Sequence, residues 1–175
     1  ETLNILENFD LGENGVDARA IHLIAEALKH GFADRARWMG DADFVDVPVD
    51  RFIGKPYAKK LAEKIKEDGV LELDAYGSPA DDVNAQVPDD AGTSHLSIID
   101  QAGNMLACTS TVNTSFGSMV YDEESGVLLN NEMADFTAQA GKPNVFGLVG
   151  SAQNEVAPGK RPLSSMSPTL VFRDG

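Results

Sequence analysis

The pair Gly92-Thr93 is the part of the sequence whose residue types most directly suggest chemistry. A threonine hydroxyl can act as a nucleophile when the threonine's own α-amino group serves as the base. That amine has a pKa of about 7.7–8.0, which suits proton transfer near neutral pH. The amine is free only if the bond between Gly92 and Thr93 is cut, for example by attack of the Thr93 hydroxyl on the Gly92 carbonyl. The sequence thus allows two interpretations: Thr93 is a self-released nucleophile, or it is simply the first residue of a strand.

A β-hairpin is predicted to begin at Thr93. Polar and apolar residues alternate from this position and resume a strand pattern after the three-residue turn 101–103, whose last residue is glycine. If Asp100 faces Asn104, counting outward places Thr111 opposite Thr93. Opposed residues of an antiparallel pair have Cβ atoms about 4.5–5.5 Å apart. The hairpin alone is therefore expected to bring the two threonine hydroxyls together.

Two amphipathic helices are predicted upstream of the hairpin. Residues 17–30 have apolar side chains at helical spacing and are followed by Gly31, a typical stop signal. The apolar stripe of this helix consists of Ile21, Ile24, Ala25 and Leu28. Residues 56–67 form the second helix, with proline in its first turn. Residues 69–92 are rich in Asp, Pro and Gly and predict a flexible acidic linker.

Short apolar segments separated by turns follow the hairpin. Residues 125–130 predict a turn and a short strand, and residues 131–136 predict a polar loop. Residues 167–172 predict another buried strand. The part of the chain after residue 92 is therefore expected to consist of strands and loops, in contrast to the helical part before it.

The composition is that of a globular protein and argues against several classes of function. The net charge of −14 over 175 residues disfavours nucleic acid as a partner, because a phosphate backbone requires clustered Lys and Arg. No apolar run is long enough to cross a bilayer. Cys108 is the single cysteine, so an internal disulfide is excluded. The three histidines lack the cysteine and carboxylate neighbours of a metal site, and no metal or other cofactor is expected.

Four motifs after residue 92 occur in a specific order and spacing. They are Thr-Ser-His at 93–95, Thr-Ser-Thr-Val-Asn-Thr-Ser-Phe-Gly at 109–117, Ser-Gly-Val-Leu-Leu-Asn-Asn-Glu-Met-Ala-Asp-Phe at 125–136, and Gly-Lys-Arg-Pro-Leu-Ser-Ser-Met-Ser-Pro-Thr at 159–169. Together they resemble γ-glutamyltranspeptidase. Upstream, residues 4–10 and 33–44 resemble the end of that family's large subunit. The chain is therefore identified as a segment of this family that spans its autoprocessing site.

The resemblance implies an α+β protein with the N-terminal-nucleophile hydrolase fold, an α/β/β/α sandwich of antiparallel sheets flanked by helices, of which this chain forms a part. Residues 1–92 would be the C-terminal part of the large subunit, and residues 93–175 the N-terminal part of the small catalytic subunit. The remaining segments of both subunits would be its partners. The family precursor cuts itself before the nucleophilic threonine, here between Gly92 and Thr93.

The resemblance also implies an activity. Members of the family take the γ-glutamyl group from glutathione and related amides, hold it as an acyl-enzyme on the threonine, and pass it to water or to an amino acid. They need no cofactor and work in the periplasm or outside the cell. These small-molecule donors and acceptors are therefore the expected partners of the complete protein.

Seven positions match the family's active site. They are Thr93, Thr111, Asn113, Glu132, Asp135, Ser164 and Ser165. By resemblance, the first threonine is the nucleophile and the second orients it. The asparagine and the two acids would receive the substrate's α-amino group, because an ammonium ion binds carboxylate and amide oxygens. The two serines would donate hydrogen bonds to the α-carboxylate.

Several alternatives stay open at this point. Taken one by one, the seven residues are also compatible with strand ends, a solvated loop face and turn caps. A cephalosporin or glutaryl acylase, or a poly-γ-glutamate depolymerase, belongs to the same superfamily. A glutaryl group has no α-amino group, so Glu132 and Asp135 favour an amino acid substrate. A third possibility is a non-catalytic segment that binds γ-glutamyl compounds.

Two parts of the family's site are expected outside this sequence. The arginine that grips the substrate carboxylate would lie upstream of Glu1, and the glycines of the oxyanion hole beyond Gly175. Since oxyanion donors lower the barrier by about 3–4 kcal/mol, the segment alone is expected to be inactive or weakly active. Residues 140–151 resemble a lid loop, with Phe146 as the aromatic residue over the pocket.

Overall fold

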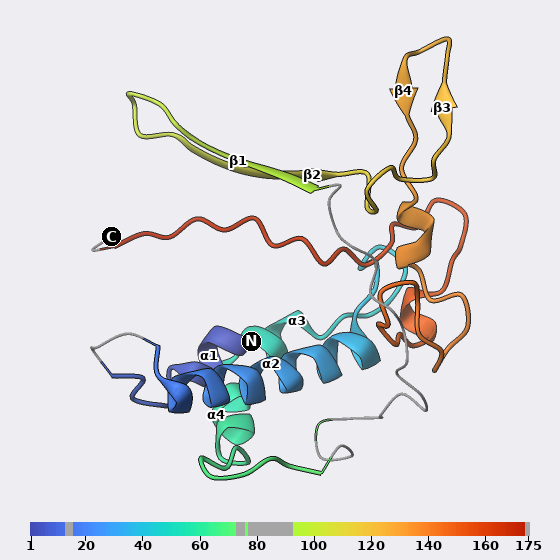
Figure 1. Ribbon diagram of the computed structural model, residues 1–175. Helices are drawn as coiled ribbons and strands as arrows, with labels where there is room; N and C mark the ends of the chain where they lie inside the picture. The colour runs from blue at the N-terminus through green and yellow to red at the C-terminus, as the bar shows by residue number, and fades with distance from the viewer. Residues whose placement is uncertain (13–15, 73–75, 77–92, 174–175) are drawn as a thin grey trace.

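The computed structural model describes residues 1–12, 16–72, 76 and 93–173 (Figure 1). Most of the predicted acidic linker, including Gly92, lies outside the described residues. The linker prediction and the peptide bond before Thr93 therefore have no structural account here.

Four helices lie among the described residues before position 72. They are α1 (Thr2–Leu6), α2 (Ala18–Trp38), α3 (Val49–Ile53) and α4 (Lys55–Ala62). The core consists of Ile5, Leu23, Ala27, Ala58, Leu61, Ala62 and Ile65. Alanines at the contacts let the helix axes approach closely, and Leu23 is fully buried between them. This helical unit supports the long helix α2, whose last turns reach the loops of the second half (Figure 1).

Helix α2 begins as predicted but does not end at Gly31. The Asp17 side chain accepts a hydrogen bond from the Ala20 amide at 2.7 Å and caps the helix. The helix then continues to Trp38. A Cβ atom on Gly31 would lie 2.8 Å from Thr2 Oγ1, so the glycine permits the close approach of α1 and does not stop the helix.

The predicted apolar stripe of α2 is also wrong. Leu23 and Ala27 are buried, whereas Ile21 and Leu28 are 59% and 41% exposed. Helical spacing fixes the periodicity of a stripe, but Ala20, Leu23 and Ala27 have the same spacing one position away. The alanine-rich stripe is the buried one, because its small side chains allow α2 to pack closely against α1 and α4.

The predicted hairpin is confirmed, including its register. Strands β1 (Thr93–Ile99) and β2 (Met105–Thr111) are antiparallel, and Thr93 pairs with Thr111. Asp100 Oδ1 accepts hydrogen bonds from two amides of the turn, each at 2.9 Å. Gly103 has φ +83°, the left-handed conformation expected at the last turn position.

The remaining elements are short. Strands β3 (Tyr121–Asp122) and β4 (Val127–Leu128) form a second antiparallel pair, which confirms the predicted turn and strand at 125–130. Two 3-10 helices follow, η2 (Glu132–Asp135) and η3 (Ala152–Asn154). Both sheets are two-stranded in the described part of the chain.

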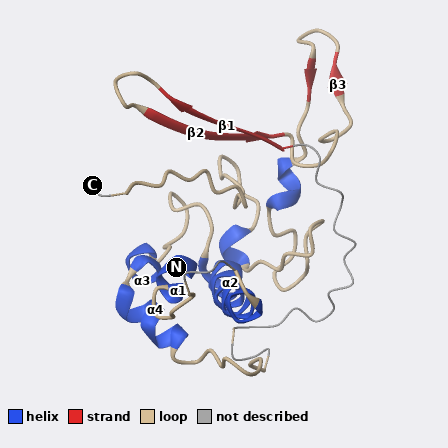
Figure 2. Cartoon of the chain, turned by 60° about the vertical axis from the view of Figure 1, so that its left-hand side comes forward, coloured by secondary structure: helices blue, strands red, loops and turns tan. Residues whose placement is uncertain are grey.

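The strand predicted at 167–172 is not observed. This segment is extended and largely exposed, and it runs between the β1–β2 hairpin and the helices in both views (Figures 1 and 2). A strand requires a neighbour that shares its hydrogen bonds. None of the described residues provides a paired strand for it.

An ion pair joins the part of the chain before residue 72 to the part after residue 93. Arg161 donates through Nε to Asp41 Oδ2 at 2.9 Å, and its backbone amide donates to the same oxygen at 2.9 Å. Asp41 is buried, and the hydrogen bonds from Arg161 hold the pKa of its carboxyl well below the usual range. Asp43 also accepts from the guanidinium. The two parts are thus clamped together beside the loops that carry the candidate site.

The observed face of α2 leads to a stability prediction. Leu23→Ala in the 175-residue chain should lower the free energy of unfolding by about 2–5 kcal/mol, because it removes a fully buried side chain. Leu28→Ala is the matched control on the same helix and should cost far less, since that side chain is 41% exposed. Urea unfolding followed by circular dichroism measures both, and a larger loss for Leu28→Ala would contradict the observed packing.

Candidate active site

The hairpin places the two predicted threonines in direct contact. Thr93 Oγ1 and Thr111 Oγ1 are 2.9 Å apart, at the open end of the β1–β2 pair. The backbone amide of Asn113 donates to Thr111 Oγ1 at 2.8 Å. Because that amide already supplies one hydrogen to Thr111 Oγ1, the Thr111 hydroxyl can direct its own hydrogen toward Thr93. Thr111 can therefore orient Thr93 and stabilise negative charge on its oxygen.

The chain changes direction at Asn113, directly after the end of β2. It adopts φ +79°, a left-handed conformation that asparagine tolerates better than most residues. Its side chain donates to the Asn131 carbonyl at 3.2 Å and toward Asp135 Oδ1 at 3.4 Å. The end of β2 is thereby tied to the loop that carries both acids.

A single turn of 3-10 helix brings the two acids together. In this helix, residues three apart lie directly above one another, so Glu132 and Asp135 project from the same side. One carboxyl oxygen of Glu132, Oε1, is buried without a hydrogen-bond partner among the described residues. Burial, helped by the hydrogen bond and charge of Asp135, raises the pKa of Glu132 to about 7. Such a pair of acids is a ready acceptor for an ammonium ion, which would supply both the missing hydrogen bonds and the positive charge.

The two serines lie on the extended segment that leads to the C-terminus. Ser164 Oγ accepts from the Met166 amide at 3.1 Å. Ser165 Oγ accepts from Arg35 Nη2 at 2.9 Å. In each case the hydroxyl hydrogen is still available for donation to another group. Two neighbouring hydroxyl donors of this kind suit a carboxylate.

One pocket contains all seven predicted residues. Its volume is about 410 Å³, a size typical of small-molecule sites. The seven are joined there by Phe32 of α2, Thr109 of β2, and Phe146, Leu148 and Met166. The pocket is therefore lined by a pair of threonines, two acids, two serines and several apolar side chains.

The predicted lid residue Phe146 does lie at this pocket, in a loop held by one asparagine. Asn144 Oδ1 accepts from the amides of Phe146 and Leu148, each at 3.0 Å. Gly147 between them has φ +73°, which allows the tight turn. The loop thus presents two apolar side chains to the pocket from a fixed backbone.

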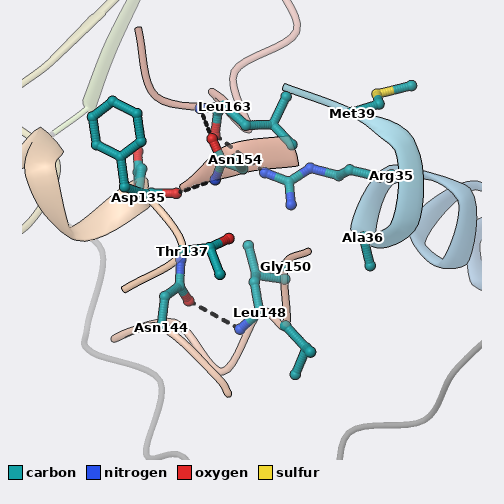
Figure 3. Close-up of a pocket in the computed structure, with 12 residues that line it drawn as sticks. Arg35, Ala36, Met39, Asp135, Thr137, Asn144, Leu148, Gly150, Asn154 and Leu163 are labelled. Carbon is teal, nitrogen blue, oxygen red and sulfur yellow. Dashed lines mark hydrogen bonds between the residues drawn. The ribbon is translucent and has the colours of Figure 1, made fainter. Parts of the chain in front are cut away.

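Two residues of the site were not found by sequence reasoning. Asn154 is buried, and its side chain donates to the Asp135 carbonyl at 2.8 Å while accepting from the Leu163 amide at 3.0 Å. Arg35 reaches the same segment from α2, as Figure 3 shows. A buried asparagine in a Gly- and Pro-rich stretch gives no local signal, and Arg35 looks like an ordinary helix-end cation in the sequence.

The wall behind Asp135 is tightly packed. A hollow of only about 10 Å³ remains between α2 and the loops around Asn154, with room for about one water molecule (Figure 3). Among the described residues there is no group of three or more His, Cys, Asp or Glu arranged for a metal ion. No helix in the described ranges is long and apolar enough to span a membrane.

The fold is compared with solved structures first. Cephalosporin acylase from Bacillus halodurans superposes with a TM-score of 0.63 over 94% of this chain and 26% of that chain, at 20% sequence identity. This similarity confirms the expected α+β class and assigns the chain to part of an N-terminal-nucleophile hydrolase fold.

The family is defined next by sequence. The Gamma-glutamyltranspeptidase family model matches residues 1–175, and the chain belongs to that family. It is 45% identical to the glutathione hydrolase proenzyme of Escherichia coli (strain K12) over 179 residues, which cover 100% of this chain and 30% of that protein. It is 35% identical to the Acylase ACY 1 proenzyme of Pseudomonas sp. (strain SE83), covering 100% of this chain and 28% of that protein. The chain thus spans about 30% of the length of the first of these relatives.

The acid pair generates a prediction about protonation. The Glu132 carboxyl should titrate near pH 7, and Asp135→Asn should move its midpoint downward without fully restoring the ordinary value, because burial remains. Carbon-13 NMR of glutamate-labelled protein measures this midpoint. Asp68→Asn, at an exposed position after helix α4, is the matched control and should leave it unchanged. A Glu132 midpoint near the ordinary 4.5 in the unmodified protein would contradict the pairing.

Proposed function

We propose that this chain carries the nucleophile and the γ-glutamyl-binding pocket of an enzyme that transfers or hydrolyses γ-glutamyl groups. The observation that carries the proposal is that one pocket of about 410 Å³ is lined by Thr93, the two acids and the two serines together. A γ-glutamyl group ends in an ammonium and a carboxylate on one carbon. The pocket offers acceptors for the first and donors for the second, with the nucleophile beside them.

The proposed acyl transfer uses Thr93 twice. Its Oγ attacks the γ-carbonyl carbon of the donor, while the free α-amine takes the hydroxyl proton and passes it to the leaving nitrogen. The C–N bond breaks, the amine leaves, and the γ-glutamyl group remains as an ester on Thr93. Water or the amino group of an acceptor then attacks the ester, and the proton returns to Thr93 Oγ. Thr111, 2.9 Å away, supports the oxygen in both steps.

The same hydroxyl is proposed to generate the free amine. Attack of Thr93 Oγ on the Gly92 carbonyl carbon would shift the acyl group from nitrogen to oxygen, and hydrolysis of the resulting ester would release the new N-terminus. Residues 1–92 and 93–175 would then belong to the large and small subunits, whose remaining segments complete the protein. In keeping with the family, we place the complete protein in the periplasm or outside the cell, with glutathione and related amides as donors.

The first test addresses the nucleophile. In the full-length protein, Thr93→Ala should abolish both self-cleavage and turnover of a γ-glutamyl p-nitroanilide donor. Thr93→Ser keeps a hydroxyl at the same position and is the matched control, which should retain measurable cleavage. Intact-mass measurement after long incubation detects the cut. Continued cleavage before residue 93 in Thr93→Ala would rule out the mechanism.

The second test separates γ-glutamyl from glutaryl substrates. Asp135→Asn should reduce kcat/KM for a γ-glutamyl donor by roughly tenfold or more, since it removes a charged partner of the α-ammonium. It should leave a glutaryl donor, which has no ammonium, nearly unaffected. Equal turnover of γ-glutamyl donor by the variant and the unmodified enzyme would instead favour an acylase acting on glutaryl groups.

A binding measurement addresses the non-catalytic alternative. Calorimetry with glutamate on the 175-residue chain would show whether the pocket binds its ligand without the missing segments. Binding without any turnover in the full-length protein would support a γ-glutamyl-binding module.

A further inference from the structure

Arg35 connects helix α2 to the hydroxyl end of the pocket. Its Nη2 donates to Ser165 Oγ at 2.9 Å and to the Leu163 carbonyl at 3.3 Å. In Figure 3 the side chain points from the helix toward Leu163 and Asn154. Arg35 lines the hollow of about 10 Å³ behind the pocket. It is not one of the described residues that line the 410 Å³ pocket.

The environment of Arg35 makes the guanidinium dependent on these contacts. Burial lowers the pKa of the guanidinium, and the charge of Asp135 opposes that shift. A half-buried cation that has lost water depends on the hydrogen bonds that it makes to protein oxygens. Holding Ser165 and Leu163 in place is therefore favourable for Arg35 itself.

Arg35 also determines what Ser165 can do. Because the oxygen accepts a hydrogen bond from the guanidinium, the hydroxyl hydrogen is directed elsewhere and can donate to an anion. A charged donor polarises the hydroxyl and makes it a better donor in turn. This is the same arrangement that the Asn113 amide produces at Thr111.

A series of hydrogen bonds connects Arg35 to the acid end of the pocket. Leu163, held by Arg35 through its carbonyl, donates through its amide to Asn154 Oδ1 at 3.0 Å. Asn154 in turn donates to the Asp135 carbonyl at 2.8 Å. The chain of contacts therefore links the serine segment to the acid segment through groups that are buried or half-buried.

We propose that Arg35 is a positioning residue that orients Ser165 and, through Leu163 and Asn154, fixes the separation between the hydroxyl and acid ends of the pocket. It thereby selects ligands with an ammonium and a carboxylate on the same carbon. The residue comes from the part of the chain before the processing site, so that part contributes to specificity without touching the substrate. This inference rests on the proposed γ-glutamyl function.

The test is a double-mutant cycle in the full-length protein. Arg35→Met should raise KM for a γ-glutamyl p-nitroanilide donor by roughly tenfold, with a smaller change in kcat, because a charged hydrogen bond that orients ground-state binding is lost. Ser165→Ala alone should raise KM similarly. Because part of the proposed effect of Arg35 goes through Ser165, the losses should not multiply: the KM of the double variant should stay clearly below the product of the two single increases. Arg37→Met, on the same helix with an exposed side chain, is the matched control and should match the unmodified enzyme.

The possible results distinguish the positioning role of Arg35 from the proposed function of the pocket. An unchanged KM in Arg35→Met, or losses that multiply in the double variant, would overturn the positioning role. If Arg35→Met does not fold, Arg35→Lys keeps the charge but not the planar donor group, and the same cycle and criteria apply to it. Absence of γ-glutamyl turnover in the unmodified protein would instead overturn the proposed function, and this inference with it.

Discussion

The register of one hairpin is the constraint on which the site depends. A slip of a single residue in β1–β2 would move Thr111 to the opposite face and separate it from Thr93. The turn at 101–103 prevents that slip through Asp100, which accepts two amide hydrogen bonds, and through the left-handed Gly103. The same register places Asn113 where its amide can reach Thr111 Oγ1. The position of Thr93, the proposed nucleophile, relative to Thr111 is therefore determined by local backbone geometry.

The acid end of the pocket, with Glu132 and Asp135, depends on a different interaction. Glu132 and Asp135 are near one another because a 3-10 turn places them so, and their closeness is electrostatically unfavourable until a cation arrives. Gly117 supports this arrangement, since a Cβ there would lie 2.3 Å from the carbonyl oxygen of Leu129, in the segment between β4 and the acids. The glycine thus allows the segment after β2 to pack closely against the segment that leads to the acids.

Features set by near neighbours in the sequence could be predicted, and those set by distant packing could not. The hairpin, its register and its turn glycine all follow from the spacing of a few residues. The buried stripe of α2 depends on which face meets α1 and α4, and the sequence offers two stripes of equal period. The strand expected at 167–172 depends on a neighbour that the spacing does not reveal.

The same distinction applies within the site. The motif resemblance indicated seven of the residues that line the pocket, because all seven lie within the four matching motifs. Asn154 and Arg35 act through contacts across the fold, and Arg35 meets Ser165 across 130 positions of sequence. Residue type and local pattern contain no information about such a contact. The contacts of these two residues could be identified only from the folded structure.

The ion pair between Asp41 and Arg161 has a consequence for a chain that is cut before Thr93. While the chain is continuous, the two partners are held at the high effective concentration that a connecting segment provides, typically in the millimolar range. Once the connection is broken, their encounter becomes bimolecular, and the contacts between the two pieces alone oppose separation. A cut molecule would therefore be sensitive to dilution and to salt in a way that the uncut molecule is not.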